Sequence, residues 1–165
     1  MLKEPILISV FVAFISSCGY EKTFEAIEVD GKFSIEVPDY LRECSDLSEE
    51  AVFQYKNRYR SFYVLVFVEE NKKTPLKKFA RSEVQELATL LIDSAISKPQ
   101  AINLNGTKGW QHITSGRLDE KFVYYIHSFV ESEKARYKIV LWTLDEKKVT
   151  HLPDFQYIIN SFREI

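Results

Sequence analysis

One long amphipathic segment lies between two groups of strand-like patterns, and this order constrains the fold more than any other feature of the chain. Thr74-Pro75 opens the segment as an N-cap followed by a proline at the first helical position. We predict a helix from Pro75 to Ser97, which ends before Lys98-Pro99. Its apolar residues recur at steps of three and four and form one face: Leu76, Phe79, Ala80, Val84, Leu87, Leu91 and Ala95.

Strand patterns stand on both sides of this helix. Asp30-Gly31 and Asn105-Gly106 each join two alternating runs and predict hairpin turns of type I′. The predicted strands are 24–29, 32–37, 52–56, 62–69, 101–104, 108–115, 122–131 and 137–144. Residues 145–152 are polar and ambiguous, and Pro153 is predicted to begin a short final helix. We therefore expect an α+β fold, with a central antiparallel β-sheet of about seven to eight strands flanked by one long and one short C-terminal helix.

The first eighteen residues have the features of an export signal. Lys3 provides a positive charge, residues 6–15 are almost wholly apolar, and Ser16-Ser17-Cys18 follows. The apolar run is too short for a spanning helix, which needs about 20 apolar residues. A bacterial lipoprotein signal, a plain secretory signal and a core helix are the three interpretations, of which the lipoprotein signal fits best.

The lipoprotein interpretation divides the chain into three parts. Residues 1–17 are the signal peptide, residues 18–23 are the lipidated Cys18 with a short tether, and residues 24–165 form a single domain. We expect Cys18 to anchor the protein in a lipid bilayer of the bacterial cell envelope. Gly19, rather than Asp, follows Cys18, which favours the outer membrane by the usual sorting pattern of lipoproteins. The five tether residues reach at most about 17 Å, so the domain is expected to lie close to the membrane.

Charge argues against nucleic acid as a partner. The net charge is −2, from 22 basic and 24 acidic residues that are spread along the chain. A nucleic-acid-binding protein would carry a clustered basic footprint.

Two short motifs carry a family resemblance. Residues 31–35, Gly-Lys-Phe-Ser-Ile, followed by Pro38, resemble the opening hairpin of the PsbP-like family, and residues 155–162 resemble its closing helix. The family includes bacterial envelope lipoproteins. The resemblance implies an α/β/α sandwich over residues 24–162 and a role without catalysis, and it carries no site residues to this chain.

The search for catalytic motifs gives no nucleotide loop, nucleophile elbow or paired-cysteine metal motif, so we expect no enzymatic activity and no cofactor. One pairing is suggestive. A two-residue turn at Asp119-Glu120 would place His112 opposite His127, and Trp110 opposite Phe129, on neighbouring strands. Two imidazoles could then reach one metal ion, although zinc needs at least three protein ligands.

Three further hypotheses about candidate site residues stay open. The two histidines are equally compatible with rings packed beside aromatic residues under a helix. Trp110, Tyr125, Phe129 and Trp142 could line an apolar pocket for a small ligand. Tyr55, Arg58, Tyr59 and Arg60 cluster near the second hairpin turn and are candidates for a contact with a protein partner.

The leading functional hypothesis is therefore a lipid-anchored envelope protein that acts as a non-enzymatic binding or accessory module. Its partner is an unknown envelope protein or a small ligand. The alternative is a periplasmic small-molecule or metal-binding protein that uses the His112/His127 face of the sheet.

Overall fold

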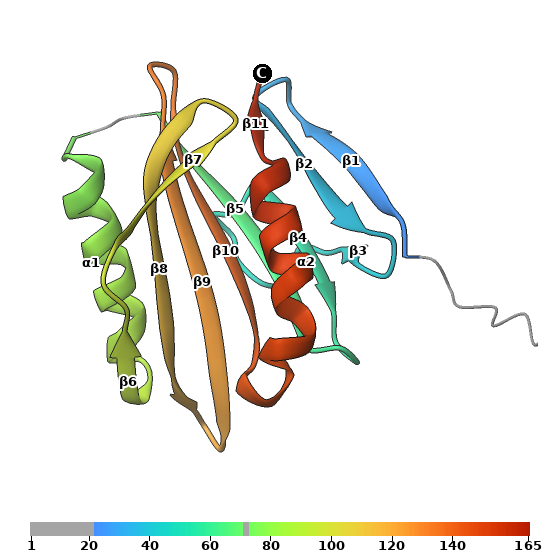
Figure 1. Cartoon of the computed structure of the whole chain (residues 1–165), viewed down its shortest axis with the longest axis vertical. Helices are drawn as coiled ribbons and strands as arrows, with labels where there is room; N and C mark the ends of the chain where they lie inside the picture. The colour runs from blue at the N-terminus through green and yellow to red at the C-terminus, as the bar shows by residue number, and fades with distance from the viewer. Residues whose placement is uncertain (1–21, 71–72) are drawn as a thin grey trace, which may run out of the picture.

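The computed structural model describes residues 22–70 and 73–165, and within them a large antiparallel sheet lies between two helices (Figure 1). Seven of the eight strands of this sheet follow the order β3-β4-β5-β10-β9-β8-β6, and the eighth, β7, also pairs with β8. A second, three-stranded sheet has the order β1-β2-β11. The elements are β1 (Phe24–Val29), β2 (Phe33–Pro38), β3 (Arg42–Glu43), β4 (Phe53–Asn57), β5 (Phe62–Glu69), α1 (Leu76–Thr89), β6 (Ile92–Ile96), β7 (Gln100–Leu104), β8 (Thr107–Leu118), β9 (Lys121–Glu131), β10 (Arg136–Leu144), a 3₁₀ turn η1 (Asp145–Lys147), α2 (Lys148–Ser161) and β11 (Arg163–Glu164).

The two helices cover opposite faces of the large sheet. Ile139 of β10 packs in the cluster that includes α2, whereas its neighbour Lys138 pairs with Glu83 of α1. Adjacent residues of a strand point to opposite faces. We call these two surfaces the α1 face and the α2 face. The predicted α+β class and α/β/α sandwich are confirmed.

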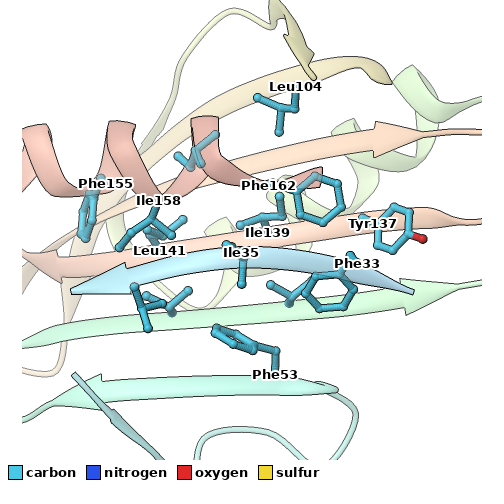
Figure 2. Packing of buried hydrophobic residues seen from close by; sticks show 14 of the residues in the cluster. Phe33, Ile35, Phe53, Leu104, Tyr137, Ile139, Leu141, Phe155, Ile158 and Phe162 are labelled. Atoms are coloured by element: carbon cyan, nitrogen blue, oxygen red, sulfur yellow. The ribbon is translucent and has the colours of Figure 1, made fainter. Parts of the chain in front are cut away.

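The α2 face holds the main core. Phe33 from the small sheet, Phe53 from β4 and Phe155 and Phe162 from the end of the chain meet over β10 (Figure 2). Phe33 stacks on Phe162 with ring centroids 5.5 Å apart and meets the ring of Tyr137 edge-on at 5.8 Å. These aromatic contacts join β2 and the end of α2 to β10 in the large sheet.

Both predicted hairpin turns are confirmed by their backbone angles. Asp30 and Gly31 have φ of 50° and 63°, and Asn105 and Gly106 have φ of 49° and 98°. A type I′ turn requires positive φ at both central residues, which glycine and asparagine tolerate.

The long helix is shorter than predicted. The helix α1 ends at Thr89, and residues 92–96 form the edge strand β6, which pairs with β8 around a bulge. Asp93, with φ of 53°, lies within this bulged segment. The prediction of a longer helix was wrong because Leu91 and Ala95 continue the helical spacing of apolar residues. In the structure, the backbone N–H and C=O groups of this segment instead form hydrogen bonds with β8.

Two helix starts also differ from the prediction. Pro75, and not Thr74, occupies the N-cap of α1, and no side chain caps the helix. The carbonyl of Thr74 instead accepts a hydrogen bond from Arg136 at 2.6 Å. The helix α2 begins at Lys148 and contains Pro153, because packing of the following apolar residues outweighs the one hydrogen bond that proline removes.

Candidate functional site

The helix α1 meets the sheet through small residues. Ala80 and Val84 are its buried side chains, and both pack on Phe129 of β9. Because the contact is narrow, the α1 face is hollowed on both flanks of the helix. Each flank has a buried histidine beneath it.

The two histidines face each other across β8 and β9. The register pairs His112 with His127 and Trp110 with Phe129, as the turn at Asp119-Glu120 predicted. Each histidine is only 4% exposed. The Nε2 atom of each ring is buried and has no hydrogen-bond partner among the described residues.

Burial keeps both rings neutral. It lowers the pKa of His127 to about 3, and Lys138 and His112 act in the same direction. Burial also lowers the pKa of His112, against a smaller opposite effect of the Ser97 carbonyl. His112 Nδ1 lies 3.4 Å from that carbonyl oxygen, which can only accept, so Nδ1 carries the proton. The Nε2 of His112 is therefore an acceptor that lacks a donor.

The first hollow, which we call the His112 hollow, has a volume of about 320 Å³. It lies between α1, the connection from β6 to β7, and β8. Ser97 holds the connection in place, because its Oγ accepts the N–H of Ile113 at 2.8 Å and its N–H donates to the Ile113 carbonyl at 2.8 Å. The lining consists of Lys77, Arg81, Val84, Gln85, Ile96, Ser97, Pro99 and His112.

The second hollow, the His127 hollow, has a volume of about 220 Å³ and a more apolar lining. Its floor belongs to a row of near-parallel rings that crosses from β5 to β9. Tyr63 stacks on Trp142 at 4.7 Å, Trp142 on Tyr125 at 5.8 Å, and Tyr125 on His127 at 5.8 Å. The further lining residues are Leu65, Phe67, Glu83, Leu87, Lys138 and Val140.

An ion pair joins α1 to the sheet beside this hollow. Lys138 of β10 donates to Glu83 of α1 at 2.6 Å, and its Nζ lies 4.0 Å from the centre of the Phe67 ring. Phe67, Glu83 and Lys138 also line a third hollow of about 220 Å³ that extends towards Arg136. The ion pair is therefore a wall common to both hollows.

Arg136 fixes the beginning of α1. Its buried guanidinium donates to Glu131 at 2.7 Å and to Glu69 at 3.0 Å, in addition to the Thr74 carbonyl. It also lies over the Phe79 ring at 4.5 Å. A buried arginine whose hydrogen bonds go to two carboxylates and a backbone carbonyl positions the helix rather than a ligand.

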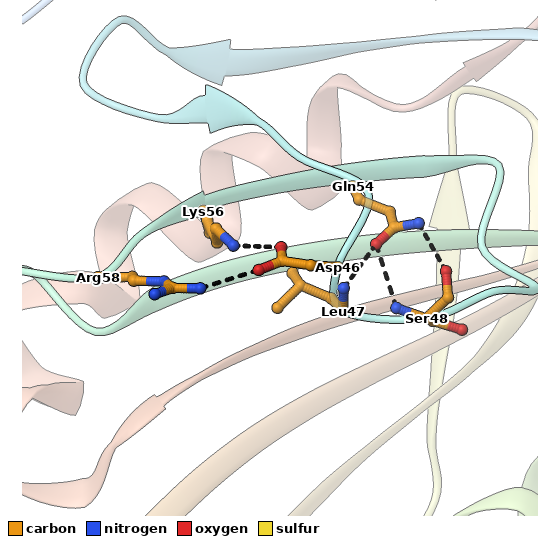
Figure 3. Close-up of polar contacts among 6 residues, drawn as sticks. All are labelled: Asp46, Leu47, Ser48, Gln54, Lys56 and Arg58. Atoms are coloured by element: carbon orange, nitrogen blue, oxygen red, sulfur yellow. Dashed lines mark hydrogen bonds and ion pairs between the residues drawn. The ribbon is translucent and has the colours of Figure 1, made fainter.

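The segment 44–51 reaches the third hollow through Glu50. The amide of Gln54 accepts hydrogen bonds from the backbone N–H groups of Leu47 and Ser48 at 3.1 Å each, and it donates to the Ser48 carbonyl at 2.6 Å (Figure 3). Asp46 forms ion pairs with Lys56 and, at 2.8 Å, with Arg58. These contacts hold Glu50 at the edge of the hollow.

The third histidine is remote from the pair. His151 lies on α2, where its Nε2 is 2.9 Å from the Arg60 carbonyl and its ring meets Phe62 edge-on at 5.0 Å. Within residues 22–70 and 73–165, no group of three or more His, Cys, Asp or Glu side chains is placed to hold a metal ion. A metal bound by His112 and His127 stays a prediction.

Of the four residues of the predicted protein-contact cluster, Arg58, Tyr59 and Arg60 are exposed at the turn and Tyr55 is partly buried. Tyr55 packs against the main core and stacks on Phe53 at 4.5 Å. Arg58 pairs with Asp46, and the guanidinium of Arg60 lies 4.2 Å from the centre of the Tyr40 ring. Tyr59 alone projects freely, with 97% of its surface exposed. A partner contact at this turn stays a prediction.

Cys18 lies outside the described residues, which begin at Lys22. Lys22 forms an ion pair with Asp154 of α2, and Tyr40 donates a hydrogen bond to the same carboxylate. Asp154 is only 6% exposed. Neither α1 nor α2 is long and apolar enough to cross a membrane, which is the result for all helices of the described part of the chain.

Sequence reasoning missed the charged residues around the histidines. Lys77, Arg81 and Glu83 lie mostly off the apolar face of the predicted helix, so the hydrophobic pattern gives them no role. Lys77 and Arg81 are spaced i, i+4 and so share a flank, which is a signal that could have been used. No sequence signal predicts that Lys138, which is 55 residues from Glu83, would meet it.

No family model and no curated protein matches this sequence. Solved structures do match in fold. Cyanobacterial PsbP (CyanoP) from Synechocystis sp. PCC 6803 superposes with a TM-score of 0.67 at 11% identity, over 92% of this chain and 99% of that chain. LpqN, involved in cell envelope biogenesis of Mycobacterium tuberculosis, gives 0.61 at 16% identity, over 87% and 91%. A protein from Pseudomonas aeruginosa, PA94, gives 0.53 at 13% identity, over 84% and 94%. The chain therefore has a PsbP-like fold.

Proposed function

We propose that this PsbP-like domain is a binding or accessory module without enzymatic activity, held at an envelope membrane by acylation of Cys18. Its fold is shared with LpqN, a protein involved in cell envelope biogenesis. The supporting sequence feature is the order of basic residue, short apolar run, small residues and cysteine in residues 1–18.

The contact of Lys22 with Asp154 carries the geometric part of this proposal. It attaches the start of the described chain to α2, and Phe24 adds a ring contact with Tyr157 at 3.9 Å between centroids. Only residues 19–21 then separate Lys22 from an acylated Cys18. Three residues reach at most about 10 Å. The Phe24 end of β1, which contacts α2, would therefore lie next to the bilayer. Any partner would then be located at or close to the membrane surface.

Replacement of Cys18 tests the anchor. We expect the wild-type chain to fractionate with membranes and to show an intact mass with acyl chains, because each buried CH₂ contributes about 0.8 kcal/mol of membrane affinity. Cys18→Ala should lose both properties. Cys44→Ala is the matched control and should keep both. An unmodified Cys18 in the wild-type protein would refute the anchor.

A second candidate function is favoured by the unpartnered Nε2 atoms of His112 and His127. They support a small-molecule or metal site on the α1 face. Titration of the full chain with Zn²⁺ separates the two versions. The metal version predicts binding heat that His127→Ala removes and His151→Ala keeps. No heat in the wild-type protein would end the metal version and leave the small-molecule version.

A further inference from the structure

The His112 hollow has an uneven distribution of charge. Lys77 and Arg81 lie one helical turn apart on α1 and line the same side of the hollow. No carboxylate is among its lining residues. Within residues 22–70 and 73–165, neither cation forms an ion pair, and Lys77 makes only a ring contact with Trp110 at 4.5 Å. The hollow therefore has an excess of positive charge.

A buried polar atom lies at the same place. His112 comes from β8 below the two cations, and its Nε2 has no partner among the described residues. A buried polar group without a partner is destabilising. Because this Nε2 is an acceptor, a bound molecule would satisfy it only with a hydroxyl or N–H donor, so the charge of an anion would be held by the two cations and not by the histidine.

The rest of the lining is largely apolar. Val84 of α1, Ile96 at the end of β6 and Pro99 lie around the same space of about 320 Å³. By contrast, the His127 hollow contains Glu83 next to Lys138, so its cation is already neutralised. The charge difference between the two hollows points to an anionic occupant only beside His112.

We propose that the His112 hollow binds a small organic anion, with its acidic group at Arg81 and Lys77 and its short apolar part against Val84, Ile96 and Pro99. This inference deepens the binding role proposed above and rests on it. It does not depend on acylation of Cys18, since membrane fractionation and anion binding are measured separately.

Three six-carbon probes of matched shape test the charge requirement. The purified full chain, in a non-ionic detergent, is titrated calorimetrically with hexanoate, hexanamide and hexylammonium, each against a detergent blank. We expect hexanoate to bind at least about tenfold more tightly than the other two, because a hydrogen bond to a charged group contributes about 1.5–3 kcal/mol. Equal affinity for hexanoate and hexanamide, or no binding of any probe, would overturn the proposal.

Two variants on α1 test the position of the charge. Arg81→Gln should weaken hexanoate binding about tenfold, since it removes a charged donor and keeps a long polar side chain. Lys78→Gln is the matched control, because Lys78 is an exposed cation of the same helix that does not line the hollow. Equal losses in the two variants would show only a general effect of charge and would refute the site.

Imidazole resonances report the location directly. Hexanoate should shift the ring signals of His112 and leave those of His151 on the α2 face unchanged. Spectra of His112→Gln and His151→Gln assign the two sets of signals. A shift confined to His151, or no shift at saturation, would place the anion elsewhere and overturn the assignment.

Discussion

The two faces of the large sheet are packed in different ways, although one helix covers each. The helix α2 contributes Phe155, Ile158 and Ile159 to a core in which aromatic side chains from the small sheet and β4 interdigitate (Figure 2). The helix α1 buries only Ala80 and Val84. Large apolar side chains stabilise a helix on a sheet, and small ones bring it close but leave its flanks open.

The histidines show the same difference. His151 under α2 is hydrogen-bonded to the Arg60 carbonyl and packed on Phe62, whereas His112 and His127 under α1 each have a buried Nε2 without a partner among the described residues. A hollow of about 410 Å³ also lies on the α2 face, between β7 and α2, and its lining consists of apolar, tyrosine and amide side chains without a charged one. The comparison indicates that the α2 face carries the larger buried core, whereas the α1 face carries the unpartnered histidines on which the proposed binding role rests.

The largest expected effect comes from shortening a buried aromatic residue. Phe62→Ala on the α2 face should lower the free energy of unfolding by about 3–5 kcal/mol, because Phe62 is fully buried and the cavity cannot collapse. Phe67→Ala, on the same strand but half-buried on the α1 face, should cost about 1–2 kcal/mol. Urea denaturation of both variants measures the difference. Equal losses would contradict the division of roles between the two faces.

An intermediate effect is expected from pH. The pKa of His127 is lowered to about 3 in the folded protein, against about 6.5 when the chain is unfolded. Below about pH 6.5 the unfolded chain binds a proton that the folded protein does not, so stability falls as pH decreases towards 3. Between pH 7 and pH 5 this one residue should reduce the free energy of unfolding by about 2 kcal/mol.

The variant His127→Phe isolates that contribution. It removes the titrating group, while His112, His151 and Lys138 remain in both proteins and contribute equally to their pH profiles. Urea denaturation at pH 7 and pH 5 should therefore show a smaller loss in the variant, by about 2 kcal/mol. An identical loss in both proteins would mean that His127 takes up a proton in the folded state and that its surroundings are more open than its burial indicates.

The register of β8 and β9 could be predicted because it depends on local chemistry. Asp119, with φ of 53°, begins a two-residue turn, and the pairing of His112 with His127 follows by counting along two strands. The Asp-Gly and Asn-Gly turns were predictable for the same reason. The edge strand β6 was not, since its residues are all exposed and show no alternation, and a helical spacing runs into them.

The hollows of the candidate site could not be predicted because they depend on tertiary packing. The amide of Gln54 holds the segment 44–51 through hydrogen bonds that include those to the backbone of Leu47 and Ser48, and no pattern in the sequence distinguishes this glutamine from a solvent-facing one (Figure 3). The positions of Lys77 and Arg81 beside His112 likewise depend on how closely α1 approaches the sheet. Small residues such as Ala80 determine that approach, and they give a weak sequence signal.

The smallest expected effect concerns the ion pair between α1 and β10. Lys138→Met removes the contact with Glu83, and both side chains are partly exposed, so the loss of stability should be within about 1 kcal/mol. The wild-type protein should also lose that increment between 0.05 and 1 M salt, about the range over which the Debye length falls from more than 10 Å to 3 Å. Lys148→Met, which removes a more exposed pair with Asp145, is the matched control.

The loss of stability in Lys138→Met shows which interactions hold α1 on the sheet. If the van der Waals contacts of Ala80 and Val84 and the hydrogen bonds of Arg136 are sufficient, Lys138→Met leaves the helix in place and merges two hollows of about 220 Å³ each into one larger space. A loss above about 2 kcal/mol would instead exceed what a partly exposed pair contributes. The helix α1 would then be held on the sheet by charge rather than by packing. Glu83 and Lys138 would in that case control access to the hollows of the α1 face.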